Sequence, residues 1–196
     1  MFRKNIPNII TLMNLSFGVL AIMIASSTDK IHLHQRGEDI NLIYFSCLFV
    51  IAAALFDRFD GQLARKLNAT SEIGKQLDSL CDLISFGVAP AVIAWKLHFA
   101  SIVLIMPGGR LIGYFLALLF PISGAIRLAR FNIQDDSHIY FGIPITLAGS
   151  ILTLLNLLNT YLFLRGSFTR ANVIACIVLM PLLSVLMISR FQVAKV

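Results

Sequence analysis

The sequence predicts an all-α integral membrane protein, a bundle of six transmembrane helices in a single domain over residues 1–196. Two features of the composition favour this class: 58% of the residues are hydrophobic and only 13% are charged. The mean hydropathy is +0.84, and apolar stretches recur at the length of about 20 residues that a helix needs to cross a bilayer. The segments between these stretches are too short to form a separate soluble domain.

Six stretches reach this length and define the expected helices in order. They cover residues 7–27, 41–64, 73–97, 111–131, 143–164 and 172–191. The first follows Arg3 and Lys4, as in a signal peptide, but it is longer than an ordinary signal-peptide core. We therefore expect it to be a retained helix. Pro90 is expected to kink the third helix, which a membrane bundle tolerates.

The basic residues indicate the orientation of the bundle. With the N-terminus in the cytoplasm, ten of the sixteen Lys and Arg residues fall on the cytoplasmic side, as the positive-inside rule requires. We therefore expect a multi-pass protein of the cytoplasmic membrane. This bias and the anionic lipid head groups account for the net charge of +6, so no nucleic-acid partner is expected.

Four aspartates lie close together where the second predicted span ends and the third begins. They are Asp57, Asp60, Asp78 and Asp82. An ionisable residue within a transmembrane segment costs about 2.5–3.5 kcal/mol on insertion scales, and it indicates function by default. Four neighbouring carboxylates repel one another unless a cation lies between them, and a divalent metal is the simplest such cation. With the N-terminus inside, the four acids lie on the cytoplasmic side.

Helical periodicity places the four acids on two faces. In the second helix one stripe holds Asp57, Asp60, Gly61 and Ala64. Arg65 lies at the edge of that stripe. In the third helix Gly74, Asp78 and Asp82 follow one another at intervals of four residues, again on one face. Because a short turn makes these helices antiparallel neighbours, the two acidic faces can converge into a cage of oxygen ligands suited to Mg²⁺ or Mn²⁺.

This combination of groups is suited to phosphate chemistry. Metal ions neutralise phosphoryl oxygens and a leaving group, and an arginine adds a planar fork of donors. A further carboxylate, such as the deepest acid Asp82, can accept a proton from an attacking hydroxyl. The small residues Gly61, Ala64 and Gly74 serve either helix packing, as small residues often do in membranes, or the close approach of a ligand.

The spacing of these residues resembles the signature of the CDP-alcohol phosphotransferase family. The pattern D-x2-D-G-x2-A-R-x8-G-x3-D-x3-D is matched at every fixed position by Asp57, Asp60, Gly61, Ala64, Arg65, Gly74, Asp78 and Asp82. Members of this family are six-helix membrane proteins, usually homodimers, in which an alcohol displaces CMP from a CDP-linked substrate. The resemblance therefore implies a homodimeric transferase.

The resemblance also implies a role for each signature residue. Asp57, Asp60 and Asp78 would hold the metal, Mg²⁺ or Mn²⁺, and Asp82 would both support the metal site and act as the general base. The CDP moiety would lie against the four remaining signature residues, Gly61, Ala64, Arg65 and Gly74.

Further segments resemble those of bacterial and archaeal phosphatidylserine synthases, a branch of the same family. These segments are residues 6–11, 85–91 and 124–132, with a weaker likeness at 141–144. The substrates that this branch implies are CDP-diacylglycerol, drawn from the membrane lipids, and L-serine. The likeness covers residues 6–150, and the last two helices add little to it.

Two pairs of polar residues outside the signature have two interpretations each. Asn8 and Thr11 either cap the first helix and bond to neighbouring helices, or border the nucleotide as this segment does in the family. Arg127 and Arg130 end the fourth span, where arginines commonly anchor a helix at the membrane surface. Alternatively they bind a substrate carboxylate or phosphate, a role that we favour more for Arg130 than for Arg127.

Two rival functions remain open at the level of sequence. A sister transferase would use another alcohol, such as glycerol 3-phosphate, an inositol phosphate or choline, and the acidic signature does not separate these acceptors. A divalent-cation transporter lined by the aspartates would need acids near mid-span and a continuous polar path. The outer halves of both acidic helices are apolar, which disfavours the transporter.

Overall fold

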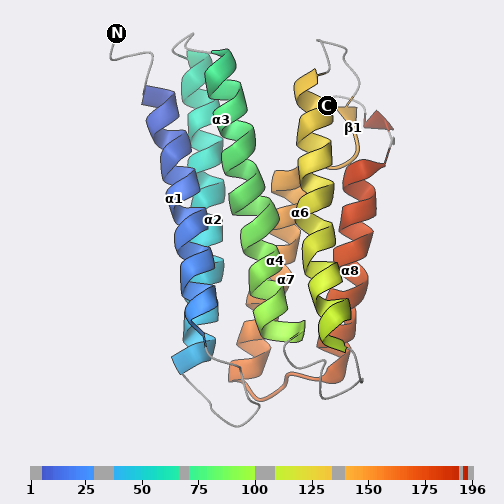
Figure 1. Cartoon of the computed structure of the whole chain (residues 1–196). Coiled ribbons are helices and arrows are strands. Elements are labelled where there is room, and N and C mark those ends of the chain that lie inside the picture. The colour runs from blue at the N-terminus through green and yellow to red at the C-terminus, as the bar shows by residue number, and fades with distance from the viewer. Residues whose placement is uncertain are drawn as a thin grey trace.

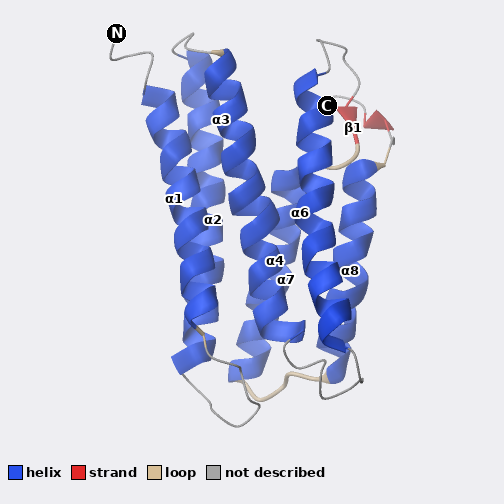
Figure 2. Cartoon of the chain, viewed as in Figure 1, coloured by secondary structure: helices blue, strands red, loops and turns tan. Residues whose placement is uncertain are grey.

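The computed structural model describes residues 6–28, 38–66, 71–99, 109–133, 140–189 and 192–193. Its helices run in chain order as α1 (Ile6–Ser27), α2 (Glu38–Lys66), α3 (Glu72–Asp82), η2 (Leu83–Val88), α4 (Ala89–Ala94), η3 (Trp95–Phe99), α6 (Gly109–Ile133), α7 (Ile145–Leu164) and α8 (Arg170–Ile188). Two strands of two residues each, β1 (Tyr140–Phe141) and β2 (Gln192–Val193), pair antiparallel (Figures 1 and 2). The prediction of an all-α membrane bundle is confirmed, because six helical spans are long and apolar enough to cross a membrane.

The third span is one continuous helical rod whose hydrogen-bonding pattern changes along its length. It begins at the N-cap Ser71, whose hydroxyl accepts a hydrogen bond from the backbone N–H of Gly74 at 3.0 Å. The π-helical segment η2 lies directly before Pro90, and a second one, η3, ends the span. Proline lacks the N–H that continues an α-helical ladder, which accounts for a wide helical turn at this place, while the kink expected at Pro90 stays a prediction.

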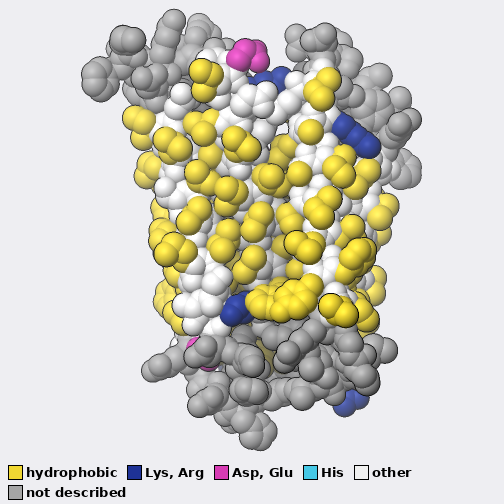
Figure 3. Space-filling view, viewed as in Figure 1, with side chains coloured by type: hydrophobic (Ala, Val, Ile, Leu, Met, Phe, Trp, Pro, Cys, Tyr) yellow, Lys and Arg dark blue, Asp and Glu magenta, His cyan; other side chains and the backbone are white. Residues whose placement is uncertain are grey.

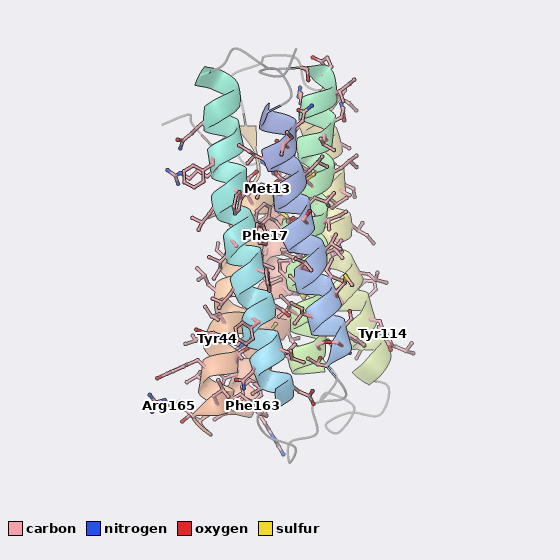
Figure 4. All side chains as sticks on the ribbon, turned by 90° about the vertical axis from the view of Figure 1, so that its left-hand side faces the viewer. Met13, Phe17, Tyr44, Tyr114, Phe163 and Arg165 are labelled. Carbon is pink, nitrogen blue, oxygen red and sulfur yellow. The ribbon has the colours of Figure 1, made fainter. Side chains whose placement is uncertain are left out.

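Helices α1 and α2 pack closely through aromatic rings. The ring of Phe17 stacks on the rings of Phe49 and Phe56, with centroids 5.9 and 5.1 Å apart. Figure 4 shows Phe17 where α1 lies beside α2. These contacts fix how far along its axis each helix lies relative to the other.

Glycines let the third span approach its other neighbours. Gly18 of α1 lies against Ser85, and a Cβ at Gly18 would be 2.8 Å from the Cα of Ser85. The Ser85 hydroxyl donates a hydrogen bond to the carbonyl of Asn14 at 3.1 Å. Gly149 of α7 lies against the backbone of Phe86. Small residues of this kind allow the close backbone contacts on which membrane helix packing depends.

Buried polar groups join three helices at one end of the bundle. His98 of η3 pairs with Asn159 of α7 at 3.3 Å, and Asn172 of α8 donates to the side-chain oxygen of Asn159 at 3.0 Å. Asn172 also accepts a hydrogen bond from the backbone of the N-cap residue Thr169 at 3.0 Å. Because each amide has a partner, the group holds the helices together at little desolvation cost.

The opposite end of the bundle carries Asp57, Asp78 and Asp82. Helices α1 and α3 begin there, and α2, α6 and α8 end there (Figure 1). Hydrophobic side chains cover the middle of the face seen in Figure 3, and the charged side chains lie towards its two ends. This distribution matches a protein whose flank contacts lipid.

Candidate functional site

Three of the four predicted aspartates converge at that end of the bundle. Asp57 of α2 meets Asp78 and Asp82 of the third span, and one possible ligand oxygen from each lies within 4.8 Å of the others. Asp57 and Asp78 are half-buried, whereas Asp82 is only 8% exposed. The side chain of Asp60 lies outside the described residues, so its predicted place in this group stays a prediction.

The convergence follows from the local structure of the two helices. Asp78 and Asp82 are four residues apart in α3 and therefore point the same way. The preceding helix α2 extends to Lys66 and brings Asp57 to the same level. Carboxylate oxygens in such a group are the ligands that Mg²⁺ and Mn²⁺ prefer. The donor set therefore fits a divalent metal, which would relieve the repulsion of three nearby negative charges.

The signature glycines differ in their surroundings. A Cβ at Gly61 would meet no heavy atom within 4 Å among the residues that the structure describes. A Cβ at Gly74 would lie 3.0 Å from the hydroxyl oxygen of Ser71 and 3.2 Å from Oδ1 of Asn8. Gly74 therefore packs tightly against α1, while no described neighbour requires a glycine at 61. The side chains of Ala64 and Arg65, also predicted to contact CDP, lie outside the described residues.

The polar residues of α1 lie along the third span. Asn8 is half-buried beside Gly74, and Thr11 is 5% exposed. Asn14, three residues further along α1, is fully buried. The spacing of the three polar residues was visible in the sequence, but the burial that distinguishes Asn14 from Asn8 was not. All three belong to the face that α1 turns towards the bundle interior.

The two arginines of α6 have different environments. Arg127 is half-buried and close enough to Asp82 for their charges to attract each other. Its Nε is buried, with no hydrogen-bond partner within the described part of the chain. Arg130 is exposed and donates from Nη1 to the carbonyl of Ile188 at 3.0 Å, at the end of α8. The structure therefore brings Arg127, rather than the favoured Arg130, towards the aspartates.

Asn132 fixes α6 against the acidic helix. Its amide donates to the side-chain oxygen of Gln76 and to the hydroxyl oxygen of Ser79, both at 3.1 Å. Gln76 and Ser79 flank Asp78 in α3. Through these bonds the end of α6 is held beside the carboxylates, with Arg127 less than two turns away.

Comparison with known proteins agrees with this geometry. A family model described as CDP-alcohol phosphatidyltransferase matches residues 4–188. The chain belongs to the CDP-alcohol phosphatidyltransferase family. The resemblance stated from the acidic signature is thereby confirmed. Because this family consists of phosphotransferases, the chain is an enzyme rather than the transporter considered above.

Curated relatives cover most of the chain. It is 38% identical over 190 residues to the CDP-diacylglycerol–serine O-phosphatidyltransferase of Helicobacter pylori, covering 95% of the chain and 70% of the relative. It is 36% identical over 152 residues to the protein of the same name from Bacillus subtilis, covering 77% and 75%. It is 29% identical over 194 residues to the archaetidylserine synthase of Methanothermobacter thermautotrophicus, covering 97% and 70%.

Proposed function

We propose that this enzyme transfers the phosphatidyl group of CDP-diacylglycerol to the hydroxyl of L-serine, giving phosphatidylserine and CMP. The observation that carries the proposal is the group of Asp57, Asp78 and Asp82 at one end of a membrane bundle. Serine as the acceptor is supported by the names of two relatives, which are 38% and 36% identical to this chain over 190 and 152 aligned residues.

The carboxylates would hold Mg²⁺ or Mn²⁺. The ligands in this proposal are Asp57, Asp60, Asp78 and Asp82, of which three have ligand oxygens within 4.8 Å of one another. When bound, such an ion neutralises charge on the pyrophosphate and on the departing phosphate. Metal analysis of the purified enzyme would give the number of ions bound.

Asp82 would act as the general base. It is the most buried of the three described carboxylates, at 8% exposed, and lies deepest along the third span. Its carboxylate would accept the proton of the serine hydroxyl as the serine oxygen attacks the phosphorus that bears diacylglycerol. The bond from that phosphorus to the CMP oxygen breaks, and CMP leaves with the electron pair.

We favour direct in-line displacement without a covalent intermediate. A covalent route needs a nucleophile activated by an adjacent base, and the sequence offers no separate nucleophile with an obvious activating base. Ser85, three residues after Asp82, donates to the carbonyl of Asn14 and serves helix packing, and the hydroxyl of Ser79, beside Asp78, bonds to the Lys75 carbonyl and to Asn132. Inversion of configuration at a chiral phosphorus would support this route, and isolation of a phosphatidyl-enzyme would contradict it.

The remaining predicted residues would hold the rest of the two substrates. Gly61, Ala64 and Arg65 would lie against CDP from α2, and Gly74 with Asn8 and Thr11 would border it from α3 and α1. Arg127 would bind the serine carboxylate, because it is near Asp82 and its Nε has no protein partner in the described ranges. Arg130 would anchor α6 to α8.

The orientation and assembly are also part of the proposal. The positive-inside bias supports a cytoplasmic position for the aspartates in the cell membrane, so CDP-diacylglycerol would enter from the cytoplasmic leaflet. A homodimer is proposed because the family resemblance implies one.

The experiment that tests this function measures CMP release by the purified enzyme in detergent micelles containing CDP-diacylglycerol. Alcohols are added singly, with Mg²⁺ or Mn²⁺ and then with excess EDTA. Release with L-serine alone, abolished by EDTA and restored by excess metal, is the expected result. Release with glycerol 3-phosphate or an inositol phosphate instead would contradict the acceptor and keep the transferase. No release with any alcohol from folded protein would contradict the proposal.

A further inference from the structure

We infer that the side-chain amide of Asn14 binds the acceptor alcohol beside Asp82 and contributes to the choice of acceptor. This inference rests on the proposed function, because it assigns one more residue to the same site. Neither the acidic signature nor the arginine pair includes Asn14.

Asn14 differs from the other buried polar residues of the described bundle. It is 0% exposed, and neither its Oδ1 nor its Nδ2 has a hydrogen-bond partner among the described residues. The buried hydroxyls of Ser46, Ser123 and Ser184 each donate to a carbonyl four residues earlier in their own helix. A buried amide with neither end bonded is costly, and a bound ligand offsets that cost.

Two contacts place Asn14 within about one helical turn of the aspartate group. Its carbonyl accepts from Ser85 at 3.1 Å, and Ser85 lies three residues, less than one helical turn, after Asp82. On the other side, Phe17 follows Asn14 by three residues, and its ring stacks on that of Phe56.

Because α1 and α2 are antiparallel, a step back along α1 from Phe17 corresponds to a step forward along α2. The step from Phe17 to Asn14 therefore leads from Phe56 towards Asp57. Asn14 is thus about one turn along the helix axes from both Asp57 and Asp82. Its neighbours on the same face, Thr11 and Gly18, are buried too, so this face is directed into the bundle.

The chemistry of an amide suits an amino-acid acceptor. One end of the Asn14 amide accepts hydrogen bonds and the other donates them, so it can serve an ammonium or a carboxylate next to the reacting hydroxyl. A phosphorylated alcohol would instead call for several cations. Arg127 approaches Asp82 from α6, whereas Asn14 approaches from α1. The acceptor would therefore be held from two helices around its hydroxyl.

The test is a pair of variants that remove one buried amide each. Asn14→Leu keeps the approximate shape of the side chain and removes its polarity. We expect the KM for L-serine to rise about tenfold or more, with an unchanged KM for CDP-diacylglycerol and a thermal midpoint at or above that of wild type. The control, Asn156→Leu, removes the amide that donates to the Pro90 carbonyl at 3.1 Å. It should lower the thermal midpoint and leave the KM for L-serine within about twofold.

Substrate analogues identify the group that the amide contacts. Each enzyme is assayed with L-serine, with 3-hydroxypropionate, which lacks the ammonium, and with ethanolamine, which lacks the carboxylate. The penalty of Asn14→Leu should disappear with the analogue that lacks the contacted group. If Asn14→Leu does not fold, Asn14→Ser and Asn14→Ala are measured in the same way.

The outcomes separate this inference from the proposed function. CMP release by wild type with L-serine decides the function before any variant is made. An Asn14→Leu enzyme with wild-type KM values for both substrates would overturn the inference and leave the function standing. The same holds for an equal rise in KM for both substrates, or an equal penalty with all three alcohols, because each would indicate a structural role.

Discussion

Gly61 and Gly74 belong to one signature but have different surroundings. A Cβ built at Gly74 would meet Ser71 of its own helix cap and Asn8 of α1, whereas no described atom lies within 4 Å of a Cβ built at Gly61. Among the described residues, helix packing therefore accounts for the glycine at 74 but not for the one at 61. This contrast motivates a substitution at Gly61.

Replacing Gly61 with alanine should separate stability from activity. Alanine is favoured over glycine within a helix by about 0.8–1.0 kcal/mol, so Gly61→Ala should hold or raise the thermal midpoint. If CDP lies against this position, the methyl group should reduce kcat/KM for CDP-diacylglycerol by about tenfold, a loss of about 1.4 kcal/mol. The exposed neighbour Gln62 provides the control, Gln62→Ala, which should change neither quantity. Full activity in Gly61→Ala would argue against nucleotide contact.

Asp82 is proposed both as the base and as one of the four metal ligands, and comparison with a second ligand on the same helix separates the two roles. Asp82→Asn removes the proton acceptor, so kcat should fall by about 10²–10⁴, while CDP-diacylglycerol binding should largely remain. Asp78→Asn, the matched control on the same helix face, should weaken binding of both metal and CDP-diacylglycerol. The measurements are single-turnover CMP release and equilibrium binding of the CDP-lipid. Turnover within a few-fold of wild type in Asp82→Asn would remove Asp82 from the role of base.

Much of the candidate site could be predicted from the sequence, because fixed spacing on a helix determines which residues share a face. The convergence of Asp57 with Asp78 and Asp82 followed from that rule and a short connection. The approach of Arg127 to Asp82 was not predicted, because it depends on how α6 is rotated against the acidic helix, and the roles of both arginines stay predictions. The unsatisfied amide of Asn14 likewise depends on neighbours from three helices, which no single-helix pattern contains.

At the scale of whole elements, α7 and the third span pack through a close backbone contact. A methyl group at Gly149 would overlap the carbonyl oxygen of Phe86 and come within 2.8 Å of its Cα. Backbone atoms cannot rotate away as a flexible side chain can, so one of the two helices would have to shift.

Gly149→Ala should therefore destabilise the protein by about 1–3 kcal/mol, the usual cost of overpacking a filled interior. The thermal midpoint in detergent is the measurement. Ser150→Ala is the control, because the Ser150 hydroxyl bonds only to the Thr146 carbonyl of its own helix turn among the described contacts. An equal midpoint for Gly149→Ala and wild type would show that the two helices are not held as closely as described.

The six spans were predictable from hydropathy alone, but the internal division of the third span was not. Apolar composition and length define a membrane helix, and they are insensitive to whether a turn is α or π. The wide turn before Pro90 arises where proline removes one donor and where Gly149 lets α7 approach the freed backbone. These are contacts between elements far apart in the sequence.

At the scale of the whole molecule, the orientation in the membrane has a direct test. Cys47, Cys81 and Cys176 are buried, so they add little background to labelling with a membrane-impermeant maleimide. Ser167→Cys, an exposed position between α7 and α8, should be labelled in intact cells. Glu72→Cys, exposed at the start of α3, should be labelled only after the membrane is permeabilised. The reverse pattern would place the aspartates outside the cytoplasm.

The wide turn of the third span sets the angular phase between two halves of a single rod. The half before it directs Asp78 and Asp82 towards α2, and the half after it directs His98 towards Asn159 of α7. Each α-helical residue adds about 100° of rotation, so losing one residue from the α-helical stretch Ala89–Ala94, which lies between Asp82 and His98, would turn one half relative to the other by about that angle. The lower half could then keep its amide partners, or the upper half its carboxylate partners, but not both. A one-codon deletion in this stretch of apolar residues would thus disrupt side-chain contacts near one membrane surface or the other, although no residue at either surface had changed.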